Sequence, residues 1–525
     1  MAQINVTVAD MMQAREARFA MQRTLLSRYP GASLVCLTMN VAGPVKTTPA
    51  IERAFEWGMA QIQAVLSGHA VLFSASIREK TGPEAVYAVQ GGAREIKRRL
   101  CALEDGCAMG RLLDIDVIGP DGEKIARTQL GLSPRRCLLC GQDAPVCARS
   151  RAHSVAALFD RTHAIIDAHF ADAYARRVGE QAQRALLYEV AITPKPGLVD
   201  RANAGAHEDM DVFTFIDSAC ALRPDFEACA REGLARRGGN PQDCLDALRA
   251  PGPLAEDAMK RATHGVNTHK GAIFSLGIYA AALGMGCDGG TSDPAAALAR
   301  CGEMTRARMQ EELARMEQQE ARTFGEEIYK KSRVGGVRAE AAGGFASVRE
   351  TALPRLRAAL DAGLSLHDAG LCALVALMAR TQDTNAVRRG GEEAAEGLRR
   401  AAAEMDEGIA AAIADGTIVT RMDAIRARLA RWDEAFIRAH ISPGGCADLL
   451  ALTLLAHFMA CAANPPRWGG LFFSKKDLPL WGRRTRRSGR GSLMRRQIER
   501  HVQLVADDAR KVLHVPGQVQ PLAVA

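Results

Sequence analysis

The pattern of apolar residues changes character near His153, and this change limits the architectures open to the chain. Before it, short apolar runs alternate with the helical pattern of Thr48–Leu66. After it, Ala-rich helical periodicity continues almost unbroken to Ala462. Strands and helices mixed in one half, with helices alone in the other, indicate two separate cores. The apolar runs that we interpret as short buried strands are Ser33–Leu37, Ala70–Ser74 and Leu112–Ile118.

The length of 525 residues also favours more than one packed unit, because single domains usually have about 100–200 residues. We predict a two-domain fold. An N-terminal mixed α/β domain covers residues 1–170, and a C-terminal all-α helical domain covers residues 180–463. Residues 464–525 depart from both patterns, and we predict a basic, solvated or poorly ordered extension there.

The formal net charge of +8 at first suggests nucleic-acid binding. Between Lys475 and Arg500, however, ten Lys or Arg residues face two acids, so this short stretch carries the entire excess and argues against a nucleic-acid partner. Fourteen cysteines show no paired spacing, the chain starts with the polar MAQINV, and no run of about 18 apolar residues occurs. We therefore expect a cytoplasmic protein with reduced thiols and no membrane partner.

Two acids stand one residue apart in the apolar strand LLDIDVI, at Asp114 and Asp116. Because successive side chains of a strand alternate between its faces, both carboxylates project from the same face. That arrangement suits Mg²⁺, which proteins usually bind through one or two carboxylates together with the substrate's phosphates. We predict that Asp114 and Asp116 are metal ligands and catalytic residues in nucleotidyltransferase-like chemistry. A pair of carboxylates at a solvated strand end is the alternative.

The segment after this strand spells C-x2-C-x6-C-x5-H, with Cys137, Cys140, Cys147 and His153. The first pair has the spacing of zinc ligands, but the second half does not repeat it. We therefore favour buried or incidental thiols and keep a structural zinc ion as the alternative. Four arginines of the same segment suit contacts with a polyphosphate. These are Arg135, Arg136, Arg149 and Arg151.

Five loops rich in Gly, Pro, Asn, His and charged residues interrupt the helical half. They read TPKPGLVDRANAGAHEDMD, THGVNTHKG, GGVRAEAAGGF, QDTNAVRRGG and SPGGCADL. Helices in a bundle normally connect through short turns, so we expect chemistry in these longer charged loops. No single loop carries both enough cations for a triphosphate and a free carboxylate. We therefore predict one site assembled from all five loops.

A triphosphate carries about four negative charges, which cations must offset in a partly dehydrated site. The cations that we assign to the phosphates are Lys195, Arg201, Lys270 and Arg388. Further substrate-binding candidates are His207, His269, Arg338, Asn385 and Arg389. Candidate metal ligands are Asp209, Asp211 and Asp383. Glu340 is the candidate catalytic base for a substrate hydroxyl.

Two ordered sets of motifs resemble known families. GPVKTTP at Gly43–Pro49, GRLLDIDV at Gly110–Val117 and PRRCLLC…CARSRAHS at Pro134–Ser154 resemble the apo-citrate lyase phosphoribosyl-dephospho-CoA transferase family over residues 8–170. From Ala185 to Ala463, ALLYEV, TPKPGLVDR, GAHEDMDVFTFIDS, GVNTHKGAIFSLG, DTNAVRRGG and SPGGCADLLAL resemble the triphosphoribosyl-dephospho-CoA synthase family. Departures from that second pattern are His264 and Ala339, where we expect glycine, and Cys446, where we expect serine.

The resemblance implies a bifunctional transferase that uses ATP and 3′-dephospho-CoA as substrates, with Mg²⁺. The synthase half would join ribose C1 of ATP to the 2′-hydroxyl of dephospho-CoA and release adenine. The transferase half would then pass the phosphoribosyl-dephospho-CoA group to a serine of the citrate lyase acyl carrier subunit and release diphosphate. Through GPVKTTP, the resemblance also places Lys46 among the substrate contacts.

Two alternatives remain open. One is the same assembly chemistry for malonate decarboxylase, whose synthase half looks similar; CLLC and CARSRAHS in the first half match the citrate lyase partner instead. The other is a non-catalytic module that binds nucleotides or a carrier protein. Release of free adenine from ATP would separate an enzyme from such a module.

Overall fold

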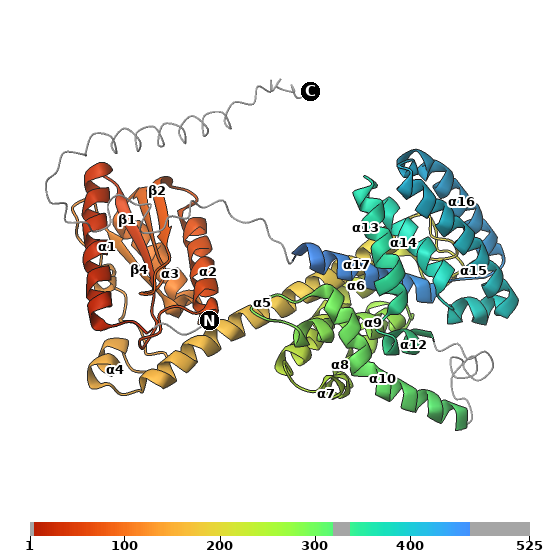
Figure 1. Cartoon of the computed structure of the whole chain (residues 1–525), viewed down its shortest axis with the longest axis horizontal. Helices are drawn as coiled ribbons and strands as arrows, with labels where there is room; N and C mark the ends of the chain where they lie inside the picture. The colour runs from red at the N-terminus through yellow and green to blue at the C-terminus, as the bar shows by residue number, and fades with distance from the viewer. Residues whose placement is uncertain (1–4, 319–335, 463–525) are drawn as a thin grey trace, which may run out of the picture.

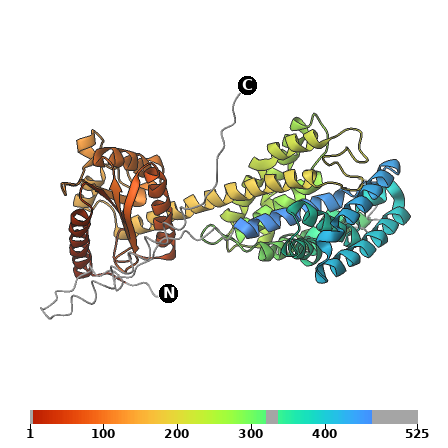
Figure 2. The ribbon, with the colours of Figure 1, turned by 90° about the horizontal axis from the view of Figure 1, so that it is seen from above.

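The computed structural model describes residues 5–318 and 336–462, so the C-terminal extension predicted at residues 464–525 lies outside the described residues. Figure 1 shows a small sheet with its helices at one end and an array of helices at the other. The long helix α5, Val155–Ala191, runs between them. The view from above shows the same arrangement (Figure 2). The described chain is thus mostly helical, with one sheet near its N-terminus, as the sequence pattern predicted.

The sheet has four antiparallel strands in the order β2-β3-β1-β4. Its strands are β1 Ser33–Met39, β2 Ala70–Ile77, β3 Glu84–Gln90 and β4 Leu113–Ile118. The helices around it are α1 Val8–Arg28, α2 Pro49–Leu66, α3 Ala93–Gly106 and α4 Ala144–Ser150, with short 3-10 turns η1 Gly110–Leu112 and η2 Arg127–Leu130. Because β4 lies at an edge, the aspartates it carries are accessible from one side of the sheet.

Both faces of the sheet are covered. Val35 and Leu37 of β1 point toward α2 and α3 and pack with Phe55. The alternate residue Cys36 points to the opposite face and packs with Met21 and neighbouring residues of α1. This alternation is the period of two expected of a strand, and it buries the central strand on both sides.

The strand predictions are correct in part. Ser33–Leu37 and Leu112–Ile118 correspond to β1 and β4, and the helical pattern of Thr48–Leu66 corresponds to α2, whose N-cap is Thr48. The prediction that Ala70–Ser74 is buried is wrong, because β2 is the other edge strand and most of its first half is exposed. Strand β3 has no counterpart among the predicted strands.

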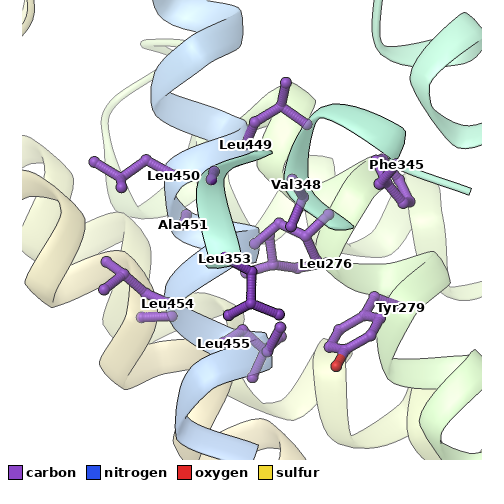
Figure 3. Packing of buried hydrophobic residues seen from close by; sticks show 14 of the residues in the cluster. Leu276, Tyr279, Phe345, Val348, Leu353, Leu449, Leu450, Ala451, Leu454 and Leu455 are labelled. Atoms are coloured by element: carbon purple, nitrogen blue, oxygen red, sulfur yellow. The ribbon is translucent and has the colours of Figure 1, made fainter. Parts of the chain in front are cut away.

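The helical part is built around two helices that are apolar on all sides, α9 and α17. Figure 3 shows Leu276 and Tyr279 of α9 in one apolar cluster with Leu455 of α17 and Leu353. The helices of this part are α6 Val212–Ala235, α7 Pro241–Ala247, α8 Pro251–Ala262, α9 Lys270–Met285, α10 Pro294–Gln318, α12 Gly336–Ala342, the π-turn η3 Val348–Ala352, α13 Leu353–Asp361, α14 Leu366–Arg380, α15 Thr384–Ala414, α16 Ile418–Arg438 and α17 Gly444–Ala462.

Helix α17 is, by length and composition alone, apolar enough to cross a membrane between Gly444 and Cys461. Most of it packs inside the helical core, with Leu450, Leu454 and Leu455 fully buried. Glycines let α6 and α9 approach closely, since a Cβ on Gly233 or Gly284 would overlap the backbone of the other helix. The helical core is therefore a close-packed array with central apolar helices.

Helix α5 is continuous across the predicted junction at residues 155–180. Its first turns contribute Ile165 and Ile166 to a core shared with α2, whereas Tyr174, Ala175 and Val178 belong to the core of the helical part. The change in sequence pattern thus falls on a single helix that enters two hydrophobic clusters.

Candidate active sites

A cavity of about 690 Å³ lies in the helical part, and all five of the predicted loops contribute to its wall. The N-terminal ends of α9, α15 and α17 open onto it, together with the loop before α6 and the start of α12. The residues proposed from the sequence that line it are Lys195, His207, Asp209, His269, Lys270, Glu340, Asp383, Asn385, Arg388 and Arg389. Backbone N–H groups at helix N-termini favour anions, so this wall suits phosphate groups.

Lys195 is fully buried and forms an ion pair with the buried Glu189 of α5. Its own loop is held in place by Asp200, whose Oδ2 accepts the Lys195 backbone N–H at 2.9 Å. Burial raises the pKa of Glu189, and the Lys195 ammonium opposes that shift. The charge of Lys195, which we assigned to phosphate, is therefore already engaged by a carboxylate inside the wall.

Asp448 of α17 is partly buried beside the start of α9. Burial raises its pKa well above the usual range, and the neighbouring carboxylates Glu189 and Asp383 raise it further. Asp383 caps two helices: its Oδ1 accepts the N–H groups of Asn385 and Ala386 at 2.8 and 3.1 Å, and its Oδ2 accepts that of Cys446 at 2.9 Å. Burial also raises the pKa of Asp383. Glu189 is engaged by Lys195 and Asp383 by backbone N–H groups, so Asp448 is the acid of this wall whose pKa is raised most clearly by its neighbours.

Glu340 of α12 lines the same cavity and is partly buried. The Ser347 hydroxyl donates to its Oε2 at 2.8 Å. Burial raises the pKa of Glu340, and the hydrogen bonds from Ser347 oppose the shift. A carboxylate of raised basicity facing a cavity has the properties of a general base.

His269 precedes α9 and is buried in the cavity wall. Its Nδ1 lies 2.7 Å from the Ser218 hydroxyl, which itself accepts from Thr268 Oγ1 at 2.8 Å. The Ser218 proton is thus directed to Nδ1, and we assign the ring proton to Nε2, a buried atom without a hydrogen-bond partner in the described residues. Burial, aided by the charge of Lys195, lowers the pKa of His269 to about 3, so the ring is neutral. It offers one unsatisfied N–H donor.

The cations at the cavity rim have protein partners. Lys270 Nζ lies 3.1 Å from Glu256 of α8 and is largely exposed. Arg389 donates to the Ala206 carbonyl at 2.7 Å and lies near His207, whose Nε2 is 3.0 Å from the Ser442 hydroxyl. Burial, together with Arg389, lowers the pKa of His207. These contacts link three of the loops at the rim.

Three residues proposed from the sequence do not line the cavity. Arg201 lies 3.3 Å from His367, and Arg338 lies 3.5 Å from Glu312. Asp211 is the N-cap of α6, where it accepts the backbone N–H of Thr214 at 2.9 Å. A side chain used to cap a helix satisfies local N–H groups, which explains an acid at this position without a metal.

The departures from the family pattern have different structural consequences. His264 has φ +54, a left-handed conformation that suits glycine, and its side chain is exposed and does not line the cavity. Ala339 is an exposed residue of α12. Cys446 is fully buried, and its N–H donates to Asp383. None of the three side chains lines the cavity.

Sequence reasoning missed Glu189 and Asp448, which line the cavity. Each interrupts an apolar helical run, in ALLYEVAI and in CADLLALTLL. An acid inside such a run is costly to bury unless it has a partner or a function, and that signal was available in the sequence.

A second set of acids lies on the α1 face of the sheet. Asp114 and Asp116 project from the same face of β4, as predicted, and β1 pairs Thr38 with both Asp114 and Glu84 of β3. Asp116 Oδ1 lies 2.6 Å from Lys124 Nζ, and Glu84 forms an ion pair with Arg18 of α1. The edge of the sheet thus presents acids with cations beside them.

Of the four predicted phosphate-binding arginines, Arg135 makes contacts inside the protein, whereas the other three are exposed. Arg135 pairs with the buried Glu104, donates to the Leu113 carbonyl at 2.8 Å and lies 3.9 Å from Asp114 Oδ1. Arg136 donates to Gly141 O at 2.8 Å. Arg149, Arg151 and Arg136 are exposed. Lys46 donates to the Val41 carbonyl at 2.6 Å, and burial, with the charge of Arg15, lowers its pKa.

The four potential zinc ligands come together. The donor atoms of Cys137, Cys140, Cys147 and His153 all lie within 4.8 Å of one another. Cys140 Sγ is 3.4 Å from Cys147 Sγ and 3.3 Å from His153 Nε2. This grouping argues against our interpretation, based on the spacing alone, that these cysteines are buried or incidental thiols.

Comparisons with known proteins agree with the two sets of motifs. Residues 175–465 match the family described as ATP:dephospho-CoA triphosphoribosyl transferase, and residues 6–169 match apo-citrate lyase phosphoribosyl-dephospho-CoA transferase. Protein CitXG of Haemophilus influenzae is 32% identical over 461 residues, which cover 86% of this chain and 95% of that protein. Protein CitXG of Leuconostoc mesenteroides is 31% identical over 462 residues, which cover 86% of this chain and 96% of that protein. A probable 2-(5′′-triphosphoribosyl)-3′-dephosphocoenzyme-A synthase of Vibrio cholerae is 40% identical over 286 residues, 54% of this chain and 88% of that protein.

Proposed function

Because the chain belongs to the family of fused proteins that join these two transferases, we propose that each reaction has its own site, one in the helical cavity and one at the edge of the sheet. The protein is a bifunctional transferase of citrate lyase prosthetic-group assembly. It makes 2′-(5′′-triphosphoribosyl)-3′-dephospho-CoA from ATP and 3′-dephospho-CoA, and transfers the phosphoribosyl-dephospho-CoA group to the apo acyl carrier. We further infer a two-domain organisation, with the junction within α5, and a cytoplasmic location.

In the helical cavity, the bond between ribose C1 and adenine breaks as C1 bonds to the 2′-oxygen of dephospho-CoA. The bond electrons leave with adenine, which takes up a proton, and the hydroxyl proton passes to a base. Glu340 fits that base, since it faces the cavity and burial raises its pKa. The neutral His269 offers its Nε2–H to a substrate oxygen from the cavity wall.

The triphosphate is held at the helix N-termini around the cavity. The loop before α9 lines this end of the cavity, and Lys270, Arg388 and Arg389 supply positive charge, whereas the N–H groups of Asn385 and Ala386 are taken by Asp383. Lys195 acts through Glu189 rather than by direct contact. Mg²⁺, when bound, would neutralise phosphate charge, and Asp448, which lines the cavity beside Gly271, is a candidate to hold it. Among our earlier metal candidates, Asp209 also lines the cavity.

At the sheet edge, the carrier serine oxygen bonds to the phosphorus of the triphosphate that is attached to ribose. Diphosphate leaves with the electrons of the broken P–O bond, and the serine proton passes to solvent or a base. Asp114 and Asp116 share the face on which a divalent ion would be held, and Lys124 and Arg135 lie next to them. Lys46, Arg136, Arg149 and Arg151 complete our candidates for binding the nucleotide.

The observation that supports this function most directly is the convergence of five separate loops on one cavity. The test is incubation of the full chain with ATP and dephospho-CoA, followed by mass spectrometry. We expect free adenine and the triphosphoribosyl product, and then a carrier subunit heavier by the phosphoribosyl-dephospho-CoA group. Without adenine, the chain would be a binding module. If apo malonate decarboxylase carrier accepted the group in preference to the citrate lyase carrier, the alternative assembly would be correct.

A further inference from the structure

The structure assigns a metal site that the two reactions do not require: we propose that Cys137, Cys140, Cys147 and His153 bind one structural zinc ion. These four side chains come from a hairpin, from α4 and from the residues before α5. The three cysteines of this group are free thiols. Three sulfurs and one imidazole form a closed set of four protein ligands, which is typical of structural rather than catalytic zinc.

The distances fit a tetrahedral ion. Zinc–sulfur bonds of about 2.3 Å place two sulfurs roughly 3.8 Å apart, and a sulfur and an imidazole nitrogen roughly 3.6 Å apart. The corresponding separations are 3.4 Å between Cys140 and Cys147 and 3.3 Å between Cys140 and His153. These two separations are within a few tenths of an ångström of the tetrahedral values, and all donor atoms lie within 4.8 Å of one another. A disulfide would require sulfurs only about 2.05 Å apart.

The backbone around the ligands is shaped before any ion binds. The backbones of Arg136 and Asp143 form an isolated antiparallel β-bridge, and the Cys137 N–H donates to the Gln142 carbonyl at 2.8 Å. These contacts close a tight hairpin that presents the Cys137 and Cys140 thiols together. Within it, the Leu139 N–H donates to Cys137 Sγ at 3.5 Å, an interaction that stabilises a ligating thiolate.

Helix α4 supplies the third ligand, Cys147, and ends at Arg151 in a left-handed conformation with φ +48. That turn reverses the chain and brings His153 back to Cys140. The ligands are therefore unevenly spaced in the sequence but close together in the structure, because α4 and the turn at Arg151 contain the residues between them.

A filled site would fix the segment Pro134–Ser154 against the transferase half. Leu138, between the first two ligands, packs on the core formed by Val41 and Ile166. Two residues after the last ligand, Val155 packs on Gly43 of GPVKTTP, where a Cβ would lie 2.7 Å from Val155 Cγ1. The ion would thus fix the segment that carries Arg135, Arg136, Arg149 and Arg151, of which Arg135 lies 3.9 Å from Asp114 of the edge strand.

The test measures metal before activity. Full-length protein purified under reducing conditions should contain about one zinc per chain, released by a mercurial thiol reagent. After removal of zinc, added Co²⁺ should give the intense thiolate charge-transfer and visible bands of a tetrahedral site. The Cys140→Ser and His153→Ala variants should lose both the bound zinc and the cobalt bands, whereas His153→Cys should keep the metal and the bands. Cys107→Ser, an exposed thiol outside the cluster, is the matched control.

Activity then separates this proposal from the function of the chain. Zinc loss should reduce transfer to the carrier at least about tenfold while adenine release continues, since the synthase cavity lies in another core. Wild-type protein that takes up no stoichiometric zinc and gives only the spectrum of hydrated Co²⁺ would overturn the site, whatever its activity. If Cys140→Ser does not fold, the cobalt spectrum of the wild type still decides.

Discussion

The carboxylate of Asp448 lies directly against the backbone of Gly271, so that a Cβ on this glycine would overlap its Oδ2. The two residues belong to α17 and α9, the two apolar helices of the core, and both line the cavity. Asp448 is partly buried and its Oδ2 would clash with the added carbon, so the carboxylate would have to move aside. The glycine of GVNTHKG therefore admits an acid to the cavity wall.

Gly271→Ala should reduce adenine release at least about tenfold, since the added methyl group displaces the Asp448 carboxylate. Alanine has higher helix propensity than glycine, so loss of helix stability would not explain the result. The control is Gly277→Ala in the same helix, where a Cβ meets Cys229 Sγ at an ordinary 3.5 Å. Steady-state adenine release is the measurement. Equal activity of the two variants would rule out a role for the Asp448 position.

Lys195→Met should lower the free energy of unfolding by about 3–5 kcal/mol, because it leaves the buried Glu189 carboxylate without its cation. The double variant Glu189→Gln/Lys195→Met should recover much of that loss. Urea unfolding followed by circular dichroism provides the comparison. A single variant that keeps its stability but loses ATP binding would instead support our first assignment of Lys195 to the phosphates.

Adenine release should decline as the pH falls through the raised pKa of Glu340, because only the deprotonated carboxylate can accept the hydroxyl proton. Ser347→Ala removes the hydroxyl hydrogen bond that lowers this pKa and keeps the one from the backbone N–H, so the acid limb of kcat/KM should move to higher pH. Glu340→Gln should remove most of the activity. An acid limb that stays in place in Ser347→Ala would show that another group controls it.

Asp116→Asn should abolish transfer to the carrier serine while adenine release continues, since Asp116 lies on the sheet and the synthase cavity in the helical core. Asp105→Asn, an exposed acid paired with Arg127, is the control and should retain both reactions. Mass spectrometry of the carrier and adenine release are measured on the same samples. Parallel loss of both reactions in Asp116→Asn would argue against separate sites.

His264→Gly should raise the free energy of unfolding by about 0.5–1 kcal/mol, because it relieves a left-handed conformation that side chains disfavour. Adenine release should stay unchanged, since the exposed His264 side chain does not line the cavity. Chemical denaturation and initial rates are the two measurements. A marked gain in activity would mean that this histidine hinders substrate after all.

Local pattern alone identified much of the framework. The same-face placement of Asp114 and Asp116 follows from the period of a strand, and the helical pattern of Thr48–Leu66 located α2. The five charged loops were recognisable because Gly, Pro and ionisable residues interrupt an otherwise continuous helical pattern. These features depend on residues close together in the chain.

Tertiary structure decided which of those side chains are available for chemistry. Glu189 neutralises Lys195, Asp211 is used by its own helix, and Asp448 reaches the cavity from an apolar helix. Likewise, the irregular spacing of Cys137, Cys140 and Cys147 becomes a cluster only after α4 folds. Burial and charge pairing depend on groups far apart in the chain, so a residue's chemical type sets what it can do, and its neighbours in space determine whether it is free to do so.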